Sequence, residues 1–268
     1  MAEQVDRAEL LAIAEAAAIS AGDLLCNSIV GSREDCRVAS GQGIVTTHDL
    51  AAEHCIRDFI LLHRPIDELI GEELGRVPGQ TGVEWIIDPI DGTANYVSGL
   101  SHWSVSIATR INGRTEAAVV HIPSVGCTYT ALAGGGSWRN GIRLPTQAGC
   151  ANLRDAVVAT GFSSSLDIRV TQLQQLMCVL EVVRDVRCHG AASVELCVVA
   201  AGELDAYYES DLRLWDVAAG ALVAAEAGIE VAGSPLAGTG TLVAAPPRLA
   251  DPLHCLVAPP CSISGEHE

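Results

Sequence analysis

Residues 85–93 read Trp-Ile-Ile-Asp-Pro-Ile-Asp-Gly-Thr, and they say more about this chain than any other stretch. The apolar run at 85–87 predicts a buried strand that leads into two carboxylates, Asp88 and Asp91. Two carboxylates on one tight turn repel each other unless a positive group lies between them, and hard cations such as Mg²⁺ take such oxygen ligands. Gly92 lets the backbone approach a ligand closely, and the free amides after it suit an anion such as phosphate. The segment therefore indicates metal-assisted chemistry on a phosphate group.

Four motifs, in order along the chain, resemble those of the inositol monophosphatase family of metal-dependent sugar phosphatases. The segment at 85–95 is similar to the signature of that family. Ile70-Gly71-Glu72-Glu73 resembles its upstream glutamate motif, and residues 214–220 resemble its C-terminal aspartate motif. Residues 45–49 resemble its Val-Thr-x-x-Asp segment. The likeness spans residues 8–236, and within it residues 184–209 are particularly similar to bacterial, actinobacterial-type members.

The order of predicted elements indicates one layered domain of mixed helices and strands. Periodicity predicts helices at 5–29 and 46–62, a mobile loop or weak hairpin at 31–43, and strands at 67–71, 83–88, 104–110, 115–123 and 127–133. The dipeptide Asn112-Gly113 predicts a hairpin between two of these strands. Past residue 146 the pattern alternates, with strands at 156–159 and 204–208, helices at 166–183, 191–201 and 216–227, and a short helix and loose tail within 246–268.

We therefore expect a single domain over residues 1–268. Its α+β half would cover residues 1–145, its α/β half would cover residues 146–268, and the two would share one cleft. The resemblance implies the α+β and α/β layered arrangement of the sugar phosphatases, an αβαβα sandwich.

The composition excludes several classes of function. The chain carries 33 acidic and 16 basic residues, a formal net charge of −17, so no basic surface could neutralise a nucleic acid. All 16 basic residues are arginines, which excludes Schiff-base and P-loop lysine mechanisms. The ten cysteines lack Cys-x-x-Cys spacing, which is typical of reduced thiols rather than a zinc site. With no signal-peptide pattern and no membrane-length apolar run, we expect a cytoplasmic protein with neither nucleic-acid nor membrane partners.

The resemblance implies a site that holds two Mg²⁺ ions. Asp88 would bridge both ions, the Ile90 carbonyl would bind one of them, and Asp91 would bind the other. Glu72 would bind the first ion and help to orient a nucleophilic water, and Asp216 would complete the second site. The residue pattern alone also allows a surface turn at 88–91, an exposed loop glutamate at 72, and a simple helix cap at 216.

The resemblance also implies a water-activating pair, Thr93 and Asp49. The pattern leaves open that Asp49 instead closes a capping box with Thr46 at the start of a helix. The amides of Gly92 and Thr93 would hold the phosphate. The remaining substrate contacts would come from Asp91, Gly190, Ala191, Ala192, Glu209 and Asp216, although a glutamate such as Glu209 is also ordinary on a loop.

The segment before residue 46 departs from the family pattern. Val38 and Gly43 stand where family members often carry a lysine and an aspartate, and that loop commonly supports a third, loosely held Mg²⁺. We therefore expect a third ion to bind weakly. Arg37 would partly substitute for the charged residues that this loop lacks. The scattered histidines lack metal-ligand spacing and are expected to be structural: His48, His102, His121 and His189.

Together these expectations predict a Mg²⁺-dependent phosphomonoesterase that acts on a small polyol or sugar phosphate, with inositol monophosphate as the first candidate substrate. Histidinol phosphate, 3′,5′-bisphosphonucleosides, fructose bisphosphate and a secondary-metabolite phosphate stay open. A non-catalytic binding or regulatory protein on the same fold is the alternative from another class, and the altered loop is its support. The resemblance also implies a homodimer.

Overall fold

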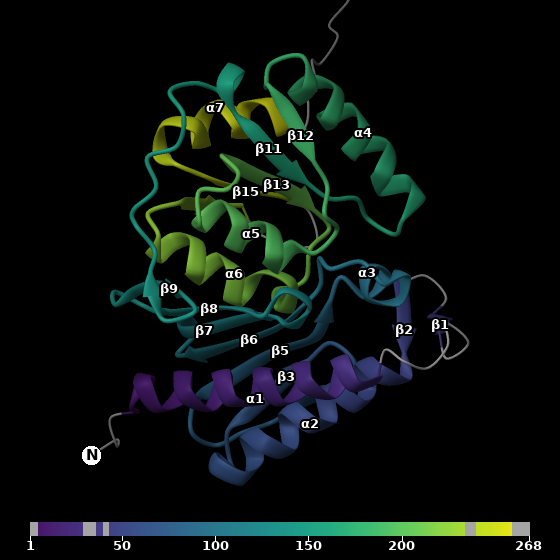
Figure 1. The fold of residues 1–268 in the computed structure, drawn as a ribbon, viewed down its shortest axis with the longest axis vertical. Helices are drawn as coiled ribbons and strands as arrows, with labels where there is room; N and C mark the ends of the chain where they lie inside the picture. The colour runs from purple at the N-terminus through teal and green to yellow at the C-terminus, as the bar shows by residue number, and fades with distance from the viewer. Residues whose placement is uncertain (1–4, 29–35, 40–42, 234–239, 259–268) are drawn as a thin grey trace, which may run out of the picture.

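Five layers make up the molecule in this computed structural model, which describes residues 5–28, 36–39, 43–233 and 240–258 (Figure 1). Helices α1 (Arg7–Ser28) and α2 (Thr47–His63) cover the outer face of an eight-stranded sheet. Helices α5 (Ala192–Ala200) and α6 (Leu214–Glu226) separate it from a five-stranded sheet, whose far side carries α4 (Leu166–Leu180) and α7 (Pro247–Val257). This αβαβα arrangement confirms the predicted fold class.

The first sheet has the strand order β10-β9-β8-β7-β6-β5-β3-β4. Every neighbouring pair is antiparallel except β3 and β5, which run parallel. Its strands are β3 (Glu68–Gly71), β4 (Gly75–Val77), β5 (Val83–Asp91), β6 (Ser104–Ile111), β7 (Arg114–Ile122), β8 (Cys127–Leu132), β9 (Gly136–Arg139) and β10 (Ile142–Arg143). The predicted hairpin joins β6 to β7, with Asn112 and Gly113 both at positive φ. Strands β4, β9 and β10 were not predicted, because they are too short for an alternating pattern to emerge.

The second sheet has the strand order β12-β11-β13-β15-β14. Strand β11 runs parallel to both β12 and β13, whereas β15 is antiparallel to its two neighbours. Its strands are β11 (Val157–Thr160), β12 (Asp185–Arg187), β13 (Ala206–Ser210), β14 (Glu230–Ala232) and β15 (Thr241–Ala245). Of these, β12, β14 and β15 were not predicted. The predicted helix over 166–183 ends sooner, at Leu180, and the chain then enters β12.

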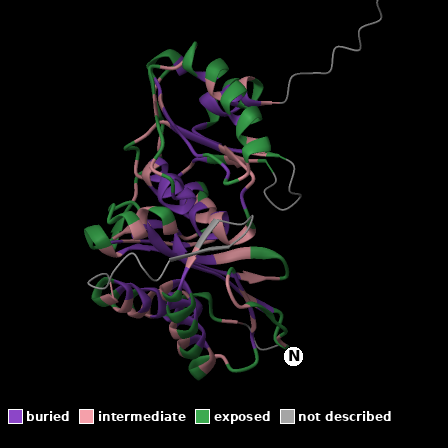
Figure 2. Cartoon of the chain, turned by 90° about the vertical axis from the view of Figure 1, so that its right-hand side faces the viewer, coloured by how far each residue is buried: buried purple, intermediate pink, exposed green. Residues whose placement is uncertain are grey.

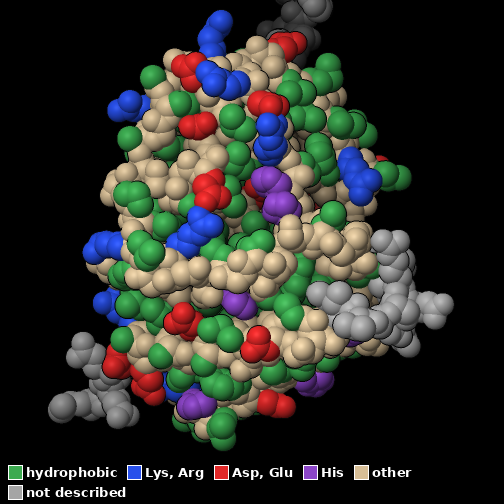
Figure 3. All heavy atoms as spheres, viewed as in Figure 1, with side chains coloured by type: hydrophobic (Ala, Val, Ile, Leu, Met, Phe, Trp, Pro, Cys, Tyr) green, Lys and Arg blue, Asp and Glu red, His purple; other side chains and the backbone are tan. Residues whose placement is uncertain are grey.

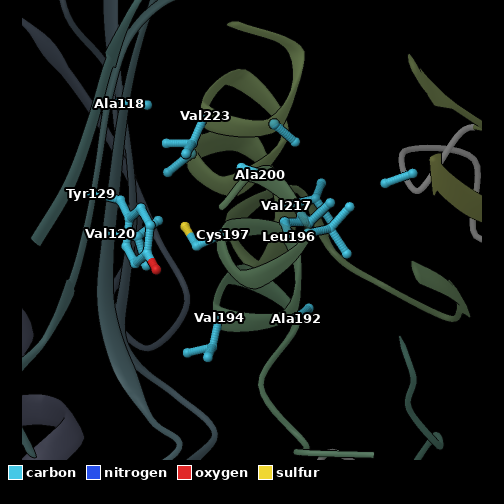
Figure 4. Packing of buried hydrophobic residues seen from close by; sticks show 14 of the residues in the cluster. Ala118, Val120, Tyr129, Ala192, Val194, Leu196, Cys197, Ala200, Val217 and Val223 are labelled. Carbon is cyan, nitrogen blue, oxygen red and sulfur yellow. The ribbon is translucent and has the colours of Figure 1, made fainter. Parts of the chain in front are cut away.

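The strands of the first sheet feed two separate cores because alternate side chains face opposite layers. In β5, Trp85 and Ile87 pack with α1 and α2, whereas Ile86 packs toward α5 and α6. Helices α5 and α6 pack closely: a Cβ added to Gly220 would lie 2.8 Å from the Cβ of Leu196. Figure 4 shows Cys197 and Val194 of α5 facing Tyr129 and Val120 of the first sheet, and Figure 2 shows that much of the helical layer between the two sheets is buried. The middle helices therefore hold the two sheets in a fixed relation.

The remaining elements are short, and one helix corrects the prediction. Strands β1 (Cys36–Ala39) and β2 (Gly43–Thr46) form an antiparallel hairpin, while residues 29–35, 40–42 and the predicted tail at 259–268 lie outside the described residues. Helix α6 begins two residues before Asp216, so Asp216 is not its N-cap. The other short helices are α3 (Thr93–Ser98), η2 (Pro123–Val125) and η3 (Leu153–Asp155). In the described part of the chain, every helix is too short or too polar to cross a membrane. The proposed division at 145/146 remains a prediction.

Candidate active site

A β-bulge in β5 sets the directions of Asp88 and Asp91. Asp88 is opposite Ser106 of β6 and Asp91 is opposite Ser104, so β5 has one residue more than its partner across this stretch. In a regular strand, residues three apart point to opposite faces. The extra residue, at the Pro89-Ile90 step, turns the Asp91 carboxylate toward the same pocket as Asp88. A bulge is also one of the few places where a sheet tolerates proline. The strand therefore continues through Asp91 rather than stopping at Asp88 as predicted.

Glu72 lies beside Asp88 because β3 and β5 are parallel. Gly71 is opposite Ile87, and the Glu72 amide donates a hydrogen bond of 3.2 Å to the Ile87 carbonyl. The carboxyl ends of both strands consequently reach the same edge of the sheet. Burial raises the pKa of Asp88, and the charge of Glu72 adds to this shift, so two acids from separate segments interact at this edge.

Glu53 holds the Glu72 turn in place, although no sequence pattern marked it. Its fully buried carboxylate forms an ion pair of 2.7 Å with Arg57. It also accepts hydrogen bonds from the amides of Glu73, at 2.8 Å, and Leu74, at 3.3 Å. Only glycine fits at position 71, because an added Cβ there would overlap the Glu53 carboxylate. A buried anion from α2 thus fixes the backbone that carries Glu72.

Gly92 turns the chain from β5 into α3. Its φ of 87° is in the left-handed region, and an added Cβ would lie 3.0 Å from both the Ala191 Cβ and the His102 carbonyl oxygen. Glycine is therefore needed here for conformation and for space. The amides of Gly92 and Thr93 stand at the N-terminus of the six-residue α3, on the wall of the same pocket.

Thr93 and Asp49 are in contact, as the resemblance implied. Thr93 Oγ1 is 3.2 Å from Asp49 Oδ1 and 3.0 Å from the Ile90 carbonyl oxygen. Asp49 is buried and also closes the capping box of α2, accepting from the Thr46 amide and hydroxyl at 2.7 and 2.6 Å. The two interpretations of Asp49 are therefore compatible, because each of its oxygens serves a different partner. Burial raises the pKa of Asp49.

Asp91 connects β5 to the middle layer. Its carboxylate accepts hydrogen bonds from the Ala192 amide at 3.2 Å and from the Ser193 amide at 2.7 Å, at the start of α5. The Ser193 hydroxyl is a third donor. Asp216 is the third residue of α6, and its side chain accepts a hydrogen bond from the amide of Arg213, the residue before that helix. Both acids are therefore held by helix N-termini, which favour negative charge.

One pocket of about 650 Å³ brings together most of the predicted residues (Figure 3 shows the outer surface). Asp49 and Ala191 do not line it, although Asp49 is one hydrogen bond away through Thr93. The predicted residues on its wall are Glu72, Asp88, Ile90, Asp91, Gly92, Thr93, Gly190, Ala192, Glu209 and Asp216.

Sequence reasoning missed the part of the wall that follows β11 and β13. The missed residues are Gly161, Phe162, Ser163, Ser164, Ser165, Ile168, Asp211, Leu212 and Arg213. One signal was available. Residues 161–165 form a Gly/Ser-rich turn directly after a predicted strand, and ligands in α/β sheets bind at the carboxyl ends of parallel strands.

Glu209 is held inside this wall by Tyr207 of β13 and by Gly161, which follows β11. Tyr207 Oη donates to Glu209 Oε2 at 2.7 Å, since residues two apart in a strand share a face. The Glu209 carboxylate packs directly on Gly161, where a Cβ would overlap it. Burial raises the pKa of Glu209 to about 8, and the nearby charge of Asp91 contributes to the shift.

The pocket concentrates negative charge that the protein does not neutralise. Burial is the largest cause of the raised pKa of Asp88, and the charges of Glu72 and Asp91 add to it. The surrounding protein also desolvates the Glu72 carboxylate and raises its pKa, and the charge of Asp216 adds to this shift. The residue as a whole is nonetheless exposed, where the pocket opens. Arg213 is the sole cationic side chain among the described residues of the wall. Buried acids in this arrangement become more stable when a cation lies between them.

The donors suit a hard divalent cation in kind and in charge. Carboxylate oxygens and the Ile90 carbonyl are the ligands that Mg²⁺ prefers. As they stand, however, no three His, Cys, Asp or Glu side chains within the described ranges are grouped closely enough to hold a metal ion.

Comparisons with known proteins agree with this fold. The model of the inositol monophosphatase family matches residues 6–259. The chain is 40% identical over 221 residues to inositol-1-monophosphatase of Mycobacterium leprae, covering 78% of this chain and 76% of that protein. It is 39% identical over 249 residues to Nus factor SuhB of Escherichia coli, covering 90% and 92%. The solved structure of Mycobacterium tuberculosis SuhB is similar with a TM-score of 0.83 and 36% identity, over 95% of this chain and 97% of that one. The chain belongs to the inositol monophosphatase family.

Proposed function

We propose that this protein is a Mg²⁺-dependent phosphomonoesterase that hydrolyses a small polyol or sugar phosphate. The observation that carries the proposal is one pocket that combines the acids of Glu72, Asp88, Asp91 and Asp216 with the backbone amides at the start of α3. Acids alone would repel a phosphate ester, whereas acids that hold cations, next to free amides, attract one. Membership of the family supports a phosphatase independently.

The metal ligands in this proposal are Glu72, Asp88, the Ile90 carbonyl, Asp91 and Asp216. When bound, two Mg²⁺ ions would neutralise the phosphate, lower the pKa of an attacking water and stabilise the leaving oxygen. A third ion would bind weakly, because Val38 and Gly43 bring no charge to the β1–β2 hairpin. The protein itself supplies the positions of these acids, through the bulge in β5 and the anchoring of the Glu72 turn by Glu53.

Thr93 and Asp49 would orient the attacking water and hold its proton. Thr93 Oγ1 donates its hydrogen to Asp49 or to the Ile90 carbonyl, which leaves its lone pairs free to accept from a water in the pocket. The buried Asp49 carboxylate, with its raised pKa, is a suitable end point for that proton relay.

The phosphate would lie on the amides of Gly92 and Thr93, and the organic part of the substrate would lie against the opposite wall. Gly190 and Ala192 have small side chains there, which leaves space for a ring. Glu209 would accept hydrogen bonds from substrate hydroxyls. Inositol monophosphate is the first candidate by this chemistry, and histidinol phosphate, 3′,5′-bisphosphonucleosides, fructose bisphosphate and secondary-metabolite phosphates are the alternatives.

A regulatory role is the second candidate, and the name of the Escherichia coli relative, Nus factor SuhB, favours it. The two roles separate in one experiment: phosphate release from a panel of phosphomonoesters, with Mg²⁺ and with a chelator. We expect release that depends on Mg²⁺ and is fastest on polyol phosphates. An absence of release from every ester would refute the phosphatase proposal and favour the regulatory one.

The variant Asp88→Asn tests the metal site directly. It should lose about 10²–10³ in turnover, the scale for removing one preorganised electrostatic group. Its fold should survive, since the change removes repulsion from its neighbouring acids. The matched control is Asp251→Asn, an exposed acid on α7. Turnover of Asp88→Asn near that of the control would contradict the assignment of Asp88.

A further inference from the structure

Asp211 is an acid of the pocket wall that the proposed function does not use. It directly follows β13, two residues past Glu209, and both residues line the pocket. Asp211 is not among the four acids that would hold the metal ions, so bound Mg²⁺ would leave its charge in place. A negative charge that remains in the wall of a substrate pocket acts on any charge that the substrate carries.

The backbone of Asp211 adopts a conformation that most residues avoid. Its φ is 69°, in the left-handed region where glycine is the ordinary choice. In the described part of the chain the other non-glycine residues with positive φ are Asn112 and Asn140, which lie in turns between neighbouring strands. Glycine would form the turn after β13 without strain, so the backbone itself does not require an aspartate here. Strained residues of this kind are concentrated at ligand-binding sites.

The Asp211 carboxylate has one oxygen fixed by the protein and one that is open to a ligand. Ser163 Oγ donates a hydrogen bond to Asp211 Oδ2. Ser163 is itself held firmly, because it is only 7% exposed and its amide donates to the side chain of Gln172 at 2.8 Å. Within the described ranges, Oδ1 accepts no hydrogen bond and no basic side chain pairs with the carboxylate. The acid is therefore held in position with acceptor capacity to spare.

We propose that Asp211 selects substrates whose organic part carries an ammonium group, so that the pocket prefers the phosphates of amino sugars and amino polyols. An ammonium group donates charge-assisted hydrogen bonds, which are stronger than the bond that a neutral hydroxyl offers. The neighbouring Glu209 carboxylate would also gain, because a nearby positive charge favours the ionised form of a buried acid. This inference rests on the proposed function and narrows its polyol phosphates to those that carry an amine.

A second phosphate group on the substrate fits this wall less well. The charged residues at the end of β13 are two acids, Glu209 and Asp211, against one base, Arg213. The excess negative charge repels a second anionic group. Arg213, which is exposed, is the side chain that would favour such a group. Its variant therefore separates a preference for bisphosphates from a preference for amines.

The test compares kcat/KM for three esters that share one skeleton: glucosamine 6-phosphate, glucose 6-phosphate and N-acetylglucosamine 6-phosphate. At about pH 6.5 the first carries an ammonium group, since amines of this kind titrate near pH 8. The second carries a hydroxyl of similar size, and the third carries the same nitrogen without the charge. We expect the ammonium ester to exceed both others by about tenfold or more, the scale of one hydrogen bond to a charged group.

The isosteric variant Asp211→Asn removes the charge alone. The asparagine carbonyl oxygen can still accept from Ser163, and asparagine tolerates a positive φ, so circular dichroism should be unchanged. The preference for the ammonium ester over the hydroxyl ester should be lost. The matched control Asp251→Asn removes the same charge from an exposed position on α7 and should keep the preference. A purely structural role of Asp211 would instead change all three esters alike.

Two results would overturn the role of Asp211. One is a wild type without the preference, or a preference that survives Asp211→Asn. The other is faster turnover of fructose 1,6-bisphosphate that is lost in Arg213→Gln, because it would assign this wall to a second phosphate.

Failure of the proposed function would be seen separately, as an absence of hydrolysis of every ester. Isothermal titration calorimetry with the same three esters and Mg²⁺ would then still test Asp211, because it does not depend on turnover. Tighter binding of the ammonium ester would support the inference, and equal or absent binding would refute it.

Discussion

Replacing Glu53 by alanine should destabilise the protein strongly, because it removes one member of a buried ion pair. The carboxylate is fully buried, and Arg57, its partner at 2.7 Å, has a side chain only 8% exposed. The substitution would leave the Arg57 guanidinium buried with the Gly75 carbonyl as its remaining partner. It would also remove the acceptor for the amides of Glu73 and Leu74. Breaking a buried pair in this way costs about 3–5 kcal/mol.

The assay is the free energy of unfolding from urea titration, supported by thermal melting. For a chain of this size each kcal/mol corresponds to a melting shift of about 2–4 °C, so we expect a decrease of roughly 6–20 °C. The control is Glu203→Ala, which removes an ion pair with Arg139 whose side chains are 49% and 42% exposed. That change should cost less than about 1 kcal/mol, because water screens exposed pairs.

A loss for Glu53→Ala as small as that of the control would refute the reasoning. It would mean that water enters the site and replaces the carboxylate. A second readout separates stability from positioning. If Glu53 fixes the Glu72 turn, Glu53→Gln should keep part of the stability, since its amide oxygen still accepts one hydrogen bond, but should raise the Mg²⁺ concentration needed for phosphate release.

Two further predictions concern Glu209 and His189. Glu209→Ala should raise KM for a polyol phosphate at a cost of about 1–3 kcal/mol in lost hydrogen bonds, yet change hydrolysis of a small aryl phosphate little; equal losses on both substrates would place Glu209 in the catalytic machinery. The hydrogen bond of 2.9 Å to Glu195 raises the pKa of His189, so this pair stabilises the fold below the ordinary pKa of 6.5 and loses that contribution as pH rises through the folded value. The destabilisation caused by His189→Gln, measured by urea titration, should therefore be larger near pH 5.5 than near pH 8.5, and a pH-independent difference would show that the pair is not ionic.

Local sequence patterns were sufficient for the long elements and for the acids of the site. The sequence shows alternating or helical periodicity in α1, α2, β5 to β8 and α5, because each of these elements buries one face or both. The short strands β4 and β10 were missed because their residues are exposed and too few to show a period. The start of α6 was misplaced, because Arg213 is an unusual N-cap and Asp216 is a common one.

The sequence by itself determined which chemical groups the protein has. These are the two aspartates after an apolar run, the glycine and threonine that follow the second aspartate, and the family motifs in their order. Only the tertiary structure decided which of these groups share a pocket. The bulge that turns Asp91 beside Asp88 depends on the register with β6, and the wall from Gly161 to Asp211 depends on two parallel strands that are neighbours in space alone. That Asp211 faces this pocket also emerged only in the folded chain, because an acid after a strand more often faces water, and local sequence does not show what lies opposite it.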